Sequence, residues 1–254
     1  MESKRPPITT IIICQDNESY IRNCLDSVTW TDEIIAVDSG SSDKTVEILT
    51  EAGAKTYHKE WEGFRKQKEH AMSLATNDWI LEVDTDEFLS AELIDEISNI
   101  TPEQWSAYTC FEVPRLTYFQ DKPIYHCGWF PDHKPRLYNR KNGTWVGLNI
   151  HEHFSSFGAK KKLESILVHK PPWDISSFMK RTLNYAIMNA KDYADTGRKA
   201  RFIDLTLRPL YTFFYKFFVR RGFLDGMRGF IICCAESFGV FVKYAVLMDI
   251  QRKK

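Results

Sequence analysis

The stretch WILEVDTDEF, residues 79–88, runs from a largely apolar segment directly into the acidic residues Asp84, Asp86 and Glu87. Carboxylates this close repel one another, and each one destabilises the fold if it is buried without a partner. Hard divalent cations such as Mg²⁺ and Mn²⁺ take oxygen ligands, and one or two carboxylates commonly hold them together with substrate phosphates. We therefore expect Asp84 and Asp86 to bind Mg²⁺ or Mn²⁺, which would offset the repulsion and neutralise the diphosphate of a nucleotide.

The first hundred residues alternate between predicted strands and predicted helices. Apolar, β-branched runs such as TTIIIC (9–14) are typical of strands that are buried on both faces of a sheet. The expected strands are 9–14, 33–38, 54–58 and 79–84, and the expected helices are 17–28, 41–53, 64–75 and 90–100, the last of them capped by Ser90. This alternation predicts right-handed crossovers and an α/β fold with a mostly parallel, Rossmann-like sheet.

Beyond residue 100 the pattern changes. Strands joined by turn-rich loops are expected at 108–119, 134–140, 143–154 and 161–169, and the chain is helical and increasingly apolar from about Ser176. We therefore divide the chain into an α/β domain (1–175) and a helical C-terminal region (176–254). Within the α/β domain, we expect residues 1–100 to form the nucleotide-binding half and residues 101–175 to form a mixed-sheet extension that binds the acceptor.

Composition excludes some classes of protein. The formal net charge is zero, so nothing indicates a nucleic-acid partner. The six cysteines have no C-x-x-C spacing, and we expect reduced thiols in a cytosolic protein. The apolar run 229–250 is long enough for a membrane span, but it contains Glu236, Lys243 and Asp249. We expect a helix that is buried or lies at the membrane surface.

Polar clusters follow three of the four predicted parallel strands. They are CQDNE (14–18), VDSGSSD (37–43) and VDTDE (83–87). Ligands of open parallel sheets bind beyond the carboxyl ends of the strands, so these clusters are expected to converge on one site. The alternative for Ser41, Ser42 and Asp43 is a helix-capping role, and both roles can coexist.

Several motifs carry a resemblance to a known family. TTIIICQDNE (9–18), DEIIAVDSGSSDKTVEI (32–48) and WILEVDTDE (79–87) resemble the GT-A domain of family 2 glycosyltransferases. Later stretches are similar to the branch that includes lipopolysaccharide-core β-1,4-glucosyltransferases, which add glucose to an inner-core heptose. These stretches are WEGFRKQKEHAM (61–72), GWFPDHKPRLYNR (128–140), NIHEH (149–153) and RRGFLDGMRGF (220–230).

The resemblance implies an inverting transferase with a UDP-hexose donor, most simply UDP-glucose. Its acceptor would be a heptose of a lipopolysaccharide or lipooligosaccharide core, or a similar glycan. Glu18 and Asp38 would bind the nucleoside, with Asp38 at the uracil edge, and Gln67 and Lys68 would contact base or ribose. The resemblance also places Asp84 near the ribose and the metal ion, and makes Asp86 a direct metal ligand.

Direct displacement needs a base that takes the proton of the acceptor hydroxyl. Glu152 is our candidate, and on a strand it would face away from His151 and His153. A zinc site at the two histidines is the lesser alternative, because no further ligand has matching spacing. His169, before a Pro-Pro loop, is the candidate for a third metal ligand. Arg136 and Arg140 would suit a diphosphate or an acceptor phosphate.

Two other functions remain open from the sequence. A haloacid-dehalogenase-like phosphatase also has an Asp-x-Asp motif after an apolar strand, although in that family the strand is normally the first. A nucleotide-sugar-binding protein without catalysis is the second alternative.

The region 202–228 mixes Phe and Tyr with Arg208, Lys216, Arg220 and Arg221. Aromatic rings favour the headgroup boundary and cations favour anionic lipid. We therefore expect peripheral attachment at the cytoplasmic face of the inner membrane. Packing of these aromatic residues as ordinary core is the alternative.

Overall fold

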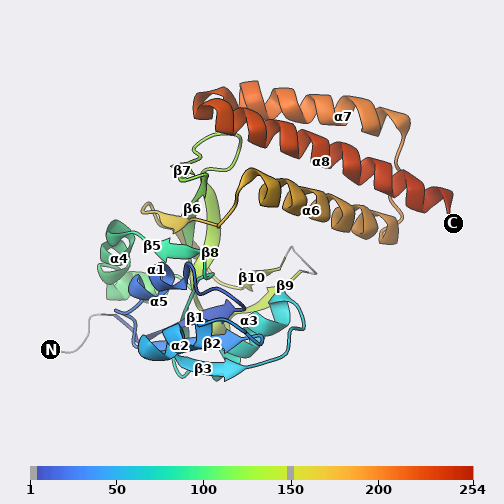
Figure 1. Cartoon of the computed structure of the whole chain (residues 1–254). Helices are drawn as coiled ribbons and strands as arrows, with labels where there is room; N and C mark the ends of the chain where they lie inside the picture. The colour runs from blue at the N-terminus through green and yellow to red at the C-terminus, as the bar shows by residue number, and fades with distance from the viewer. Residues whose placement is uncertain (1–4, 148–151, 254) are drawn as a thin grey trace. The chain divides into compact units, whose positions relative to one another are not determined.

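The structure is a computed structural model that describes residues 5–147 and 152–253, and it contains two compact units (Figure 1). The first unit comprises the chain up to Leu116 together with Asp132–Pro171. The second comprises Thr117–Pro131 and the chain from Pro172 onwards. The segment 117–131 thus belongs with the C-terminal helices, whereas the sequence placed it in the α/β domain. All the candidate site residues lie in the first unit.

Four parallel strands form the nucleotide-binding half of the first unit, in the order β3-β2-β1-β4. They are β1 (Ile8–Cys14), β2 (Glu33–Asp38), β3 (Lys55–His58) and β4 (Trp79–Glu82). The helices between them are α1 (Ile21–Asp26), α2 (Thr45–Glu51) and α3 (Phe64–Leu74). Every residue of β2 and β4 is buried, as their largely apolar character predicted.

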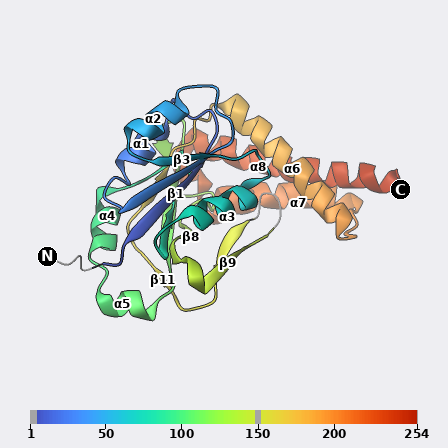
Figure 2. The ribbon, with the colours of Figure 1, turned by 90° about the horizontal axis from the view of Figure 1, so that it is seen from below.

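Helices cover both faces of this sheet. Apolar side chains of α1, α2, α4 (Ala91–Ser98) and α5 (Pro102–Ala107) pack on one face, where they meet residues such as Ile12 and Leu81. Ala71 and Ala75, on α3 and at its end, pack on the other face against Ile11 and Ile80. Figure 2 shows α3 on the opposite side of β1 from α1 and α2. Ser90 caps α4 by accepting from Leu93 N, as predicted.

The sheet continues with antiparallel neighbours beyond β4. In order, β4 is followed by β8 (Asp132–Asn139), β6 (Cys110–Phe119), β12 (Leu167–His169) and β5 (Glu87–Leu89). The short strands β7 (Lys122–Pro123) and β11 (Lys160–Lys162) pair with β6. The predicted α/β fold, with its mostly parallel sheet, mixed-sheet extension and C-terminal helices, is confirmed.

A separate two-stranded ribbon contains the region expected as one strand at 143–154. It consists of β9 (Gly143–Val146) and β10 (His153–Ser156). Glu152 immediately precedes β10, so it is not part of a strand. His151 lies outside the described residues, which leaves the predicted alternation with His153 untested.

The second unit is built from three long helices. They are α6 (Ile175–Asp195), α7 (Phe202–Phe214) and α8 (Gly226–Arg252). Two short helical segments, η2 (Tyr215–Val219) and η3 (Gly222–Asp225), lie between α7 and α8 in the sequence. A third, η1 (Arg140–Asn142), follows β8 in the first unit. Helix α8 packs against both α6 and α7. The continuous helical stretch Gly222–Arg252 is long and apolar enough to cross a membrane by length and composition, and a third of its most apolar window is buried.

Candidate active site

The loops after β1 and β2 are bonded to each other at the carboxyl ends of these strands. Asp16 accepts from Ser42 N at 2.8 Å, and its own backbone N–H donates to Ser41 Oγ at 2.9 Å. Glu18 Oε2 accepts from Lys44 N at 2.9 Å, while Glu18 N donates to Asp43 at 3.0 Å. These polar residues therefore hold together two of the three strand-end clusters that the sequence analysis expected to converge.

Asp38 is buried at the end of β2 and shapes the turn that follows it. Its Oδ2 accepts from Gly40 N at 2.9 Å and from Ser41 N at 3.0 Å, and its Oδ1 accepts from Ser41 Oγ. Gly40 has a φ of +93°, a conformation that glycine adopts without strain. Asp43 accepts from Thr45 N at 2.9 Å, but the N-cap position of α2 is Lys44, so none of Ser41, Ser42 and Asp43 occupies it.

Gln67 and Lys68 point inward from α3 and are both buried. Gln67 Nε2 donates to Ser39 Oγ at 2.7 Å and to the Lys59 carbonyl at 2.9 Å, which fixes the segments that follow β2 and β3. Because Gln67 has no exposed surface, its influence on a ligand passes through Ser39 and Lys59.

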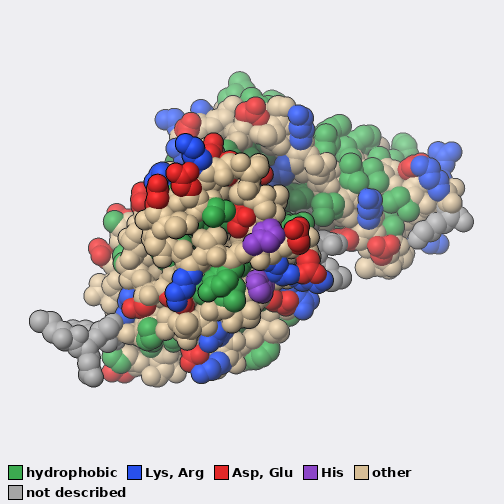
Figure 3. Space-filling model, turned by 60° about the horizontal axis from the view of Figure 1, so that its bottom comes forward, with side chains coloured by type: hydrophobic (Ala, Val, Ile, Leu, Met, Phe, Trp, Pro, Cys, Tyr) green, Lys and Arg blue, Asp and Glu red, His purple; other side chains and the backbone are tan. Residues whose placement is uncertain are grey.

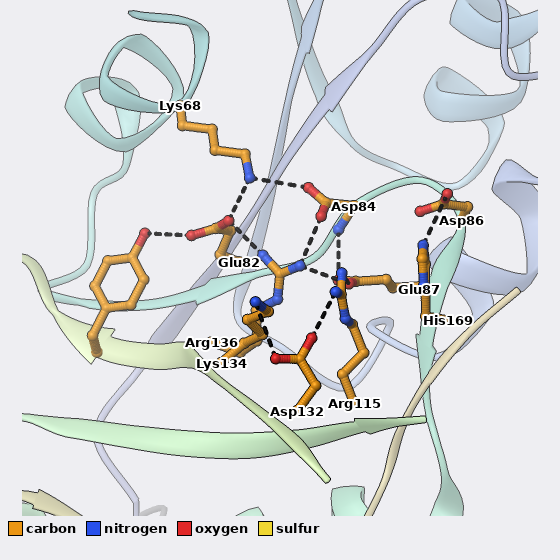
Figure 4. A network of polar contacts seen from close by, with 11 residues as sticks. Lys68, Glu82, Asp84, Asp86, Glu87, Arg115, Asp132, Lys134, Arg136 and His169 are labelled. Carbon is orange, nitrogen blue, oxygen red and sulfur yellow. Dashed lines mark hydrogen bonds and ion pairs between the residues drawn. The ribbon is translucent and has the colours of Figure 1, made fainter. Parts of the chain in front are cut away.

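A network of charged side chains surrounds the end of β4 (Figure 4). Lys68 Nζ lies 2.7 Å from Glu82 Oε1 and 3.2 Å from Asp84 Oδ1. Arg136, on β8, donates to the same Glu82 oxygen at 2.5 Å, to Asp84 Oδ2 at 2.7 Å and to Glu87 Oε1 at 2.6 Å. Tyr138 donates its hydroxyl to Glu82 at 3.2 Å. Two cations thus hold three carboxylates.

The outer part of this network contains a second arginine. Arg115 lies 3.4 Å from Glu87 and 2.7 Å from Asp132, which also lies 3.1 Å from Lys134. Strand β6 carries Arg115, and strand β8 carries Asp132 and Lys134. The antiparallel register of these strands pairs Arg115 with Asp132, and it explains why residues distant in sequence meet here.

Lys68 and Arg136 therefore offset the repulsion between the neighbouring carboxylates. Burial disfavours the charged form of Asp84, but the adjacent Arg136 and Lys68 hold the pKa of its carboxyl well below the usual range. Burial also opposes the charge of Lys68, yet Asp84 and Glu82 raise the pKa of its ammonium group. The sequence analysis expected a metal ion to offset this repulsion, and the structure adds Arg136 and Lys68 as protein partners of Asp84. Arg136, which was expected to contact a diphosphate or an acceptor phosphate, forms ion pairs with Glu82, Asp84 and Glu87 in this structure.

Asp86 points away from this network and meets a histidine. His169 Nε2 lies 3.3 Å from Asp86 Oδ2, and Lys170 N donates to the Asp86 carbonyl at 2.8 Å. Strand β12 pairs with β5 so that His169 is opposite Glu87, and this register brings the imidazole to the acidic turn. Burial, followed by the charge of Asp86, raises the pKa of Tyr20, which places the loop after β1 near the same turn.

The Asp86–His169 pair has the donor chemistry for a divalent cation. A carboxylate oxygen and an imidazole nitrogen 3.3 Å apart can bind one ion together. In the described part of the chain, no group of three or more His, Cys, Asp or Glu side chains is arranged to hold a metal. A cation bound here would need further oxygen ligands, of the kind that a phosphate group carries.

Glu152 lies in the electrostatic field of the same network. Burial raises the pKa of its carboxyl, as do the charges of Asp84 and Glu82, while Lys68 lowers it. Its Oε2 is buried and has no hydrogen-bond partner among the described residues. The structure thus brings Glu152 into the same region as Lys68 and Asp84, although both are distant from it in the sequence.

Arg140 is the candidate that the fold separates from the others. It follows β8, and its guanidinium donates to the carbonyls of Met72 and Ala75 at 3.1 and 2.6 Å, closing the end of α3. The register of β8 with β4 pairs Asn139 with Trp79, at the opposite end of β4 from Asp84.

Sequence reasoning missed Glu82 and Arg115. Both are charged residues within predicted strands, and a charge in an otherwise apolar strand requires a partner. That requirement was the available signal for Glu82 in WILEVD. Its partners, on α3 and β8, are defined only by tertiary packing.

The fold and the site together define an α/β protein whose polar side chains gather where three parallel strands end. Residues 9–163 match the family described as "Glycosyl transferase family 2". An uncharacterized glycosyltransferase of Rickettsia prowazekii is 31% identical over 97% of this chain and 88% of its own length. The chain belongs to glycosyl transferase family 2, and it is a glycosyltransferase that uses a nucleotide sugar. The phosphatase alternative is therefore wrong.

Two further proteins are similar to this chain. The lipopolysaccharide core biosynthesis glycosyltransferase LpsC of Rhizobium meliloti is 26% identical, over 94% of both chains. Among solved structures, residues 1–349 of S. aureus TarS match with a TM-score of 0.49 at 13% identity, covering 98% of this chain and 92% of that one.

Proposed function

We propose that the protein is an inverting, metal-dependent transferase that moves a hexose, glucose in the first instance, from UDP to a heptose of a lipopolysaccharide or lipooligosaccharide core or a similar glycan. The observation that carries the proposal is the Glu152 carboxyl. It is half-buried, its pKa is raised by burial, and one of its oxygens has no partner in the described part of the chain. A general base needs these properties, since a raised pKa increases basicity and a free oxygen can accept a proton.

In this proposal Glu152 accepts the proton of the acceptor hydroxyl as that oxygen attacks the anomeric carbon. The bond from the anomeric carbon to the donor's diphosphate oxygen breaks in the same step, and the nucleoside diphosphate leaves. One displacement inverts the configuration at the anomeric carbon, and no covalent sugar–enzyme intermediate forms.

Asp86 and His169 are the residues proposed to hold Mg²⁺ or Mn²⁺. When bound there, the cation would neutralise the charge that develops on the departing diphosphate. Asp84 is less suited to direct ligation, because its two oxygens already face Arg136 and Lys68. A divalent ion next to these two cations would be repelled, so we assign Asp84 to the ribose side.

The donor's nucleoside is proposed to lie over the braced loops after β1 and β2. Glu18 is exposed there, and Asp38 presents a carboxylate that the turn at Gly40 and Ser41 holds in place. A carboxylate group has about four acceptor positions, and Asp38 uses three of them for the Gly40 and Ser41 donors, so its Oδ1 can still receive the uracil imide N–H. Gln67 and Lys68 support this surface from beneath, as their burial indicates.

The acceptor class is proposed from the relative LpsC, whose name refers to lipopolysaccharide core biosynthesis. Such acceptors carry a lipid anchor, so we place the enzyme at the cytoplasmic face of the inner membrane. The six cysteines are all free thiols, which is compatible with a reducing compartment.

A panel of UDP-sugars and GDP-sugars, tested against soluble and lipid-linked heptose acceptors with Mn²⁺, tests this function. We expect turnover with UDP-glucose and a heptose, and inverted stereochemistry in the product. Retained stereochemistry would contradict the role of Glu152. Isothermal titration completes the test, because donor binding without turnover on any acceptor would favour the non-catalytic alternative.

A further inference from the structure

Helix α7 presents a row of apolar side chains to solvent. Ile203, Leu207, Leu210, Phe214 and Phe218 recur at intervals of three and four residues, and each is 53–56% exposed. This spacing places them on one helical face that continues from α7 into η2. Tyr211 stacks on Tyr215 and Phe214 stacks on Phe218, so the aromatic rings line this face in ordered pairs.

The opposite face of the same segment is apolar as well. Phe213 and Phe217 pack against the buried cluster that includes Ile232 of α8. Leu205 packs against a second cluster around Tyr244 and Leu247 of that helix. Apart from Asp204, Thr206, Arg208 and Thr212, helix α7 carries apolar side chains both toward α8 and toward solvent, a pattern typical of helices that contact a partner or lipid on their outer face. Helix α7 is therefore not the outer layer of an ordinary soluble bundle, whose solvent face is polar.

The exposed apolar surface extends into η3 and the start of α8. It includes Val219, Phe223, Leu224, Met227 and Phe230, which are all exposed. Figure 3 shows hydrophobic side chains gathered on the helical part of the chain, with basic side chains among them. We call the exposed apolar residues of 202–230 the α7 face. Monomeric proteins rarely expose such a continuous apolar area without a partner.

The charges beside the α7 face have one sign. Residues 202–230 contain only two acids, and both are turned inward: Asp204 is buried against Arg208, and Asp225 bonds the backbone of His126. Arg220 and Arg221 are exposed, and neither forms an ion pair with any residue that the structure describes. Fixed positive charge beside exposed aromatic rings complements an anionic, interfacial partner.

We propose that the α7 face binds the surface of a bilayer that contains anionic lipid, with Arg220 and Arg221 at the headgroups. A second copy of the chain is a poorer occupant, because a two-fold interface would place the same positive patch against itself. This proposal rests on the membrane location proposed above and names the surface that makes the contact. Its test does not measure glycosyl transfer.

The contact is peripheral rather than a span. Helix α8 passes the length and composition test for a span, but it lies against α6 and α7 and buries Ile232, Cys233 and Leu247 between them. It also carries Glu236, which is paired with Lys216, and Lys243, which lies over the ring of Tyr244. Charges at the centre of a bilayer are costly, and here they have partners within the protein.

Co-sedimentation of the full chain with vesicles tests the proposal. The vesicles are phosphatidylcholine alone, or phosphatidylcholine with phosphatidylglycerol. We expect binding to the anionic vesicles at low salt, and release in high salt, because each cation at such a surface contributes roughly 1 kcal/mol and is screened by ions. Arg220→Glu with Arg221→Glu should weaken the partition by roughly tenfold or more. Lys160→Glu with Lys162→Glu, on exposed β11, is the matched control and should bind normally.

The apolar part is tested by Phe214→Glu with Phe218→Glu, which should reduce binding to the anionic vesicles at low salt. Trp61→Glu with Phe157→Glu, two exposed aromatic residues of the other unit, is the control. Circular dichroism confirms that each variant is folded. Binding that survives both the charge reversals and the Phe substitutions would overturn the proposal. So would protein that resists both salt and alkaline carbonate extraction, which indicates insertion, or a Phe variant that changes only the oligomeric state by sedimentation velocity.

Discussion

Arg136 lies between the two carboxylates that close the acidic turn, with Nη2 2.7 Å from Asp84 Oδ2 and 2.6 Å from Glu87 Oε1. The arginine comes from β8, which pairs antiparallel with β4, so the strand that ends in the acidic turn is bonded to the strand that supplies its counter-charge. The acidic turn therefore has a fixed shape before any ligand binds. A site that holds a diphosphate and a sugar benefits from such preorganisation, because little ordering remains at the time of binding.

Removing this arginine should destabilise the protein strongly. Arg136→Met leaves the buried Glu82 and Glu87 and the partly buried Asp84 with too few partners, and breaking a buried charge network typically costs about 3–5 kcal/mol. Chemical unfolding measures the loss. Lys141→Met, which removes an exposed pair with Asp78, is the control and should change little. Equal unfolding free energies for the two variants would show that the network does not stabilise the fold.

Glu152→Gln should bind the donor normally and turn over slowly. The amide keeps the size and loses the basicity, and a positioned base contributes about 10²–10⁴-fold to the rate. Steady-state rates and titration with UDP-glucose separate the two effects. Glu164→Gln, an exposed carboxylate in the same unit, serves as the control. Unchanged turnover would assign the base to another acid.

The acid side of the pH profile should also report Glu152. Because burial raises its pKa, activity is expected to fall with decreasing pH at a value above the usual range for glutamate. The folded protein then holds this proton more tightly than the unfolded chain, whose glutamate pKa is about 4.3. Glu152 therefore stabilises the folded state below the pKa of the unfolded chain, and this contribution is lost as the pH rises from there to the pKa of Glu152 in the folded protein. The free energy of unfolding of Glu152→Gln, measured across the same pH range, should not show this loss.

Asp84 and Asp86 should respond differently to substitution although they are two residues apart. Asp86→Ala is expected to weaken Mn²⁺ binding in the presence of UDP by at least about tenfold, since even outer partners of a metal site have effects of that size. Isothermal titration of Mn²⁺ gives this value without an activity assay. His169→Ala should behave in the same way, and Asp95→Ala, on the exposed side of α4, should bind normally.

Asp84→Ala should lower the unfolding free energy instead, because it removes a partner of both Arg136 and Lys68. Loss of Mn²⁺ binding in Asp84→Ala with unchanged stability would reverse the roles that the geometry assigns to the two aspartates.

The sequence by itself determined the parallel strands and the placement of polar residues at their ends. Strands such as Glu33–Asp38 are predicted from local pattern, because burial on both faces favours a nearly continuous apolar run such as Ile34–Val37. The family resemblance, confirmed by the match over residues 9–163, followed from short motifs at those strand ends. The expected strand at 143–154 was less secure, and the structure has β9 and β10 there with Glu152 before the second.

Tertiary structure alone decided which charges meet. Lys68, Arg136 and Glu82 lie on a helix, an antiparallel strand and a parallel strand, and their contacts depend on strand register and helix packing that no local pattern specifies. The same holds for His169, which reaches Asp86 only because β12 pairs with β5. It holds for α7 as well: the sequence shows a basic and aromatic segment, but only packing separates Phe213 and Phe217, which face the core, from Phe214 and Phe218, which face solvent.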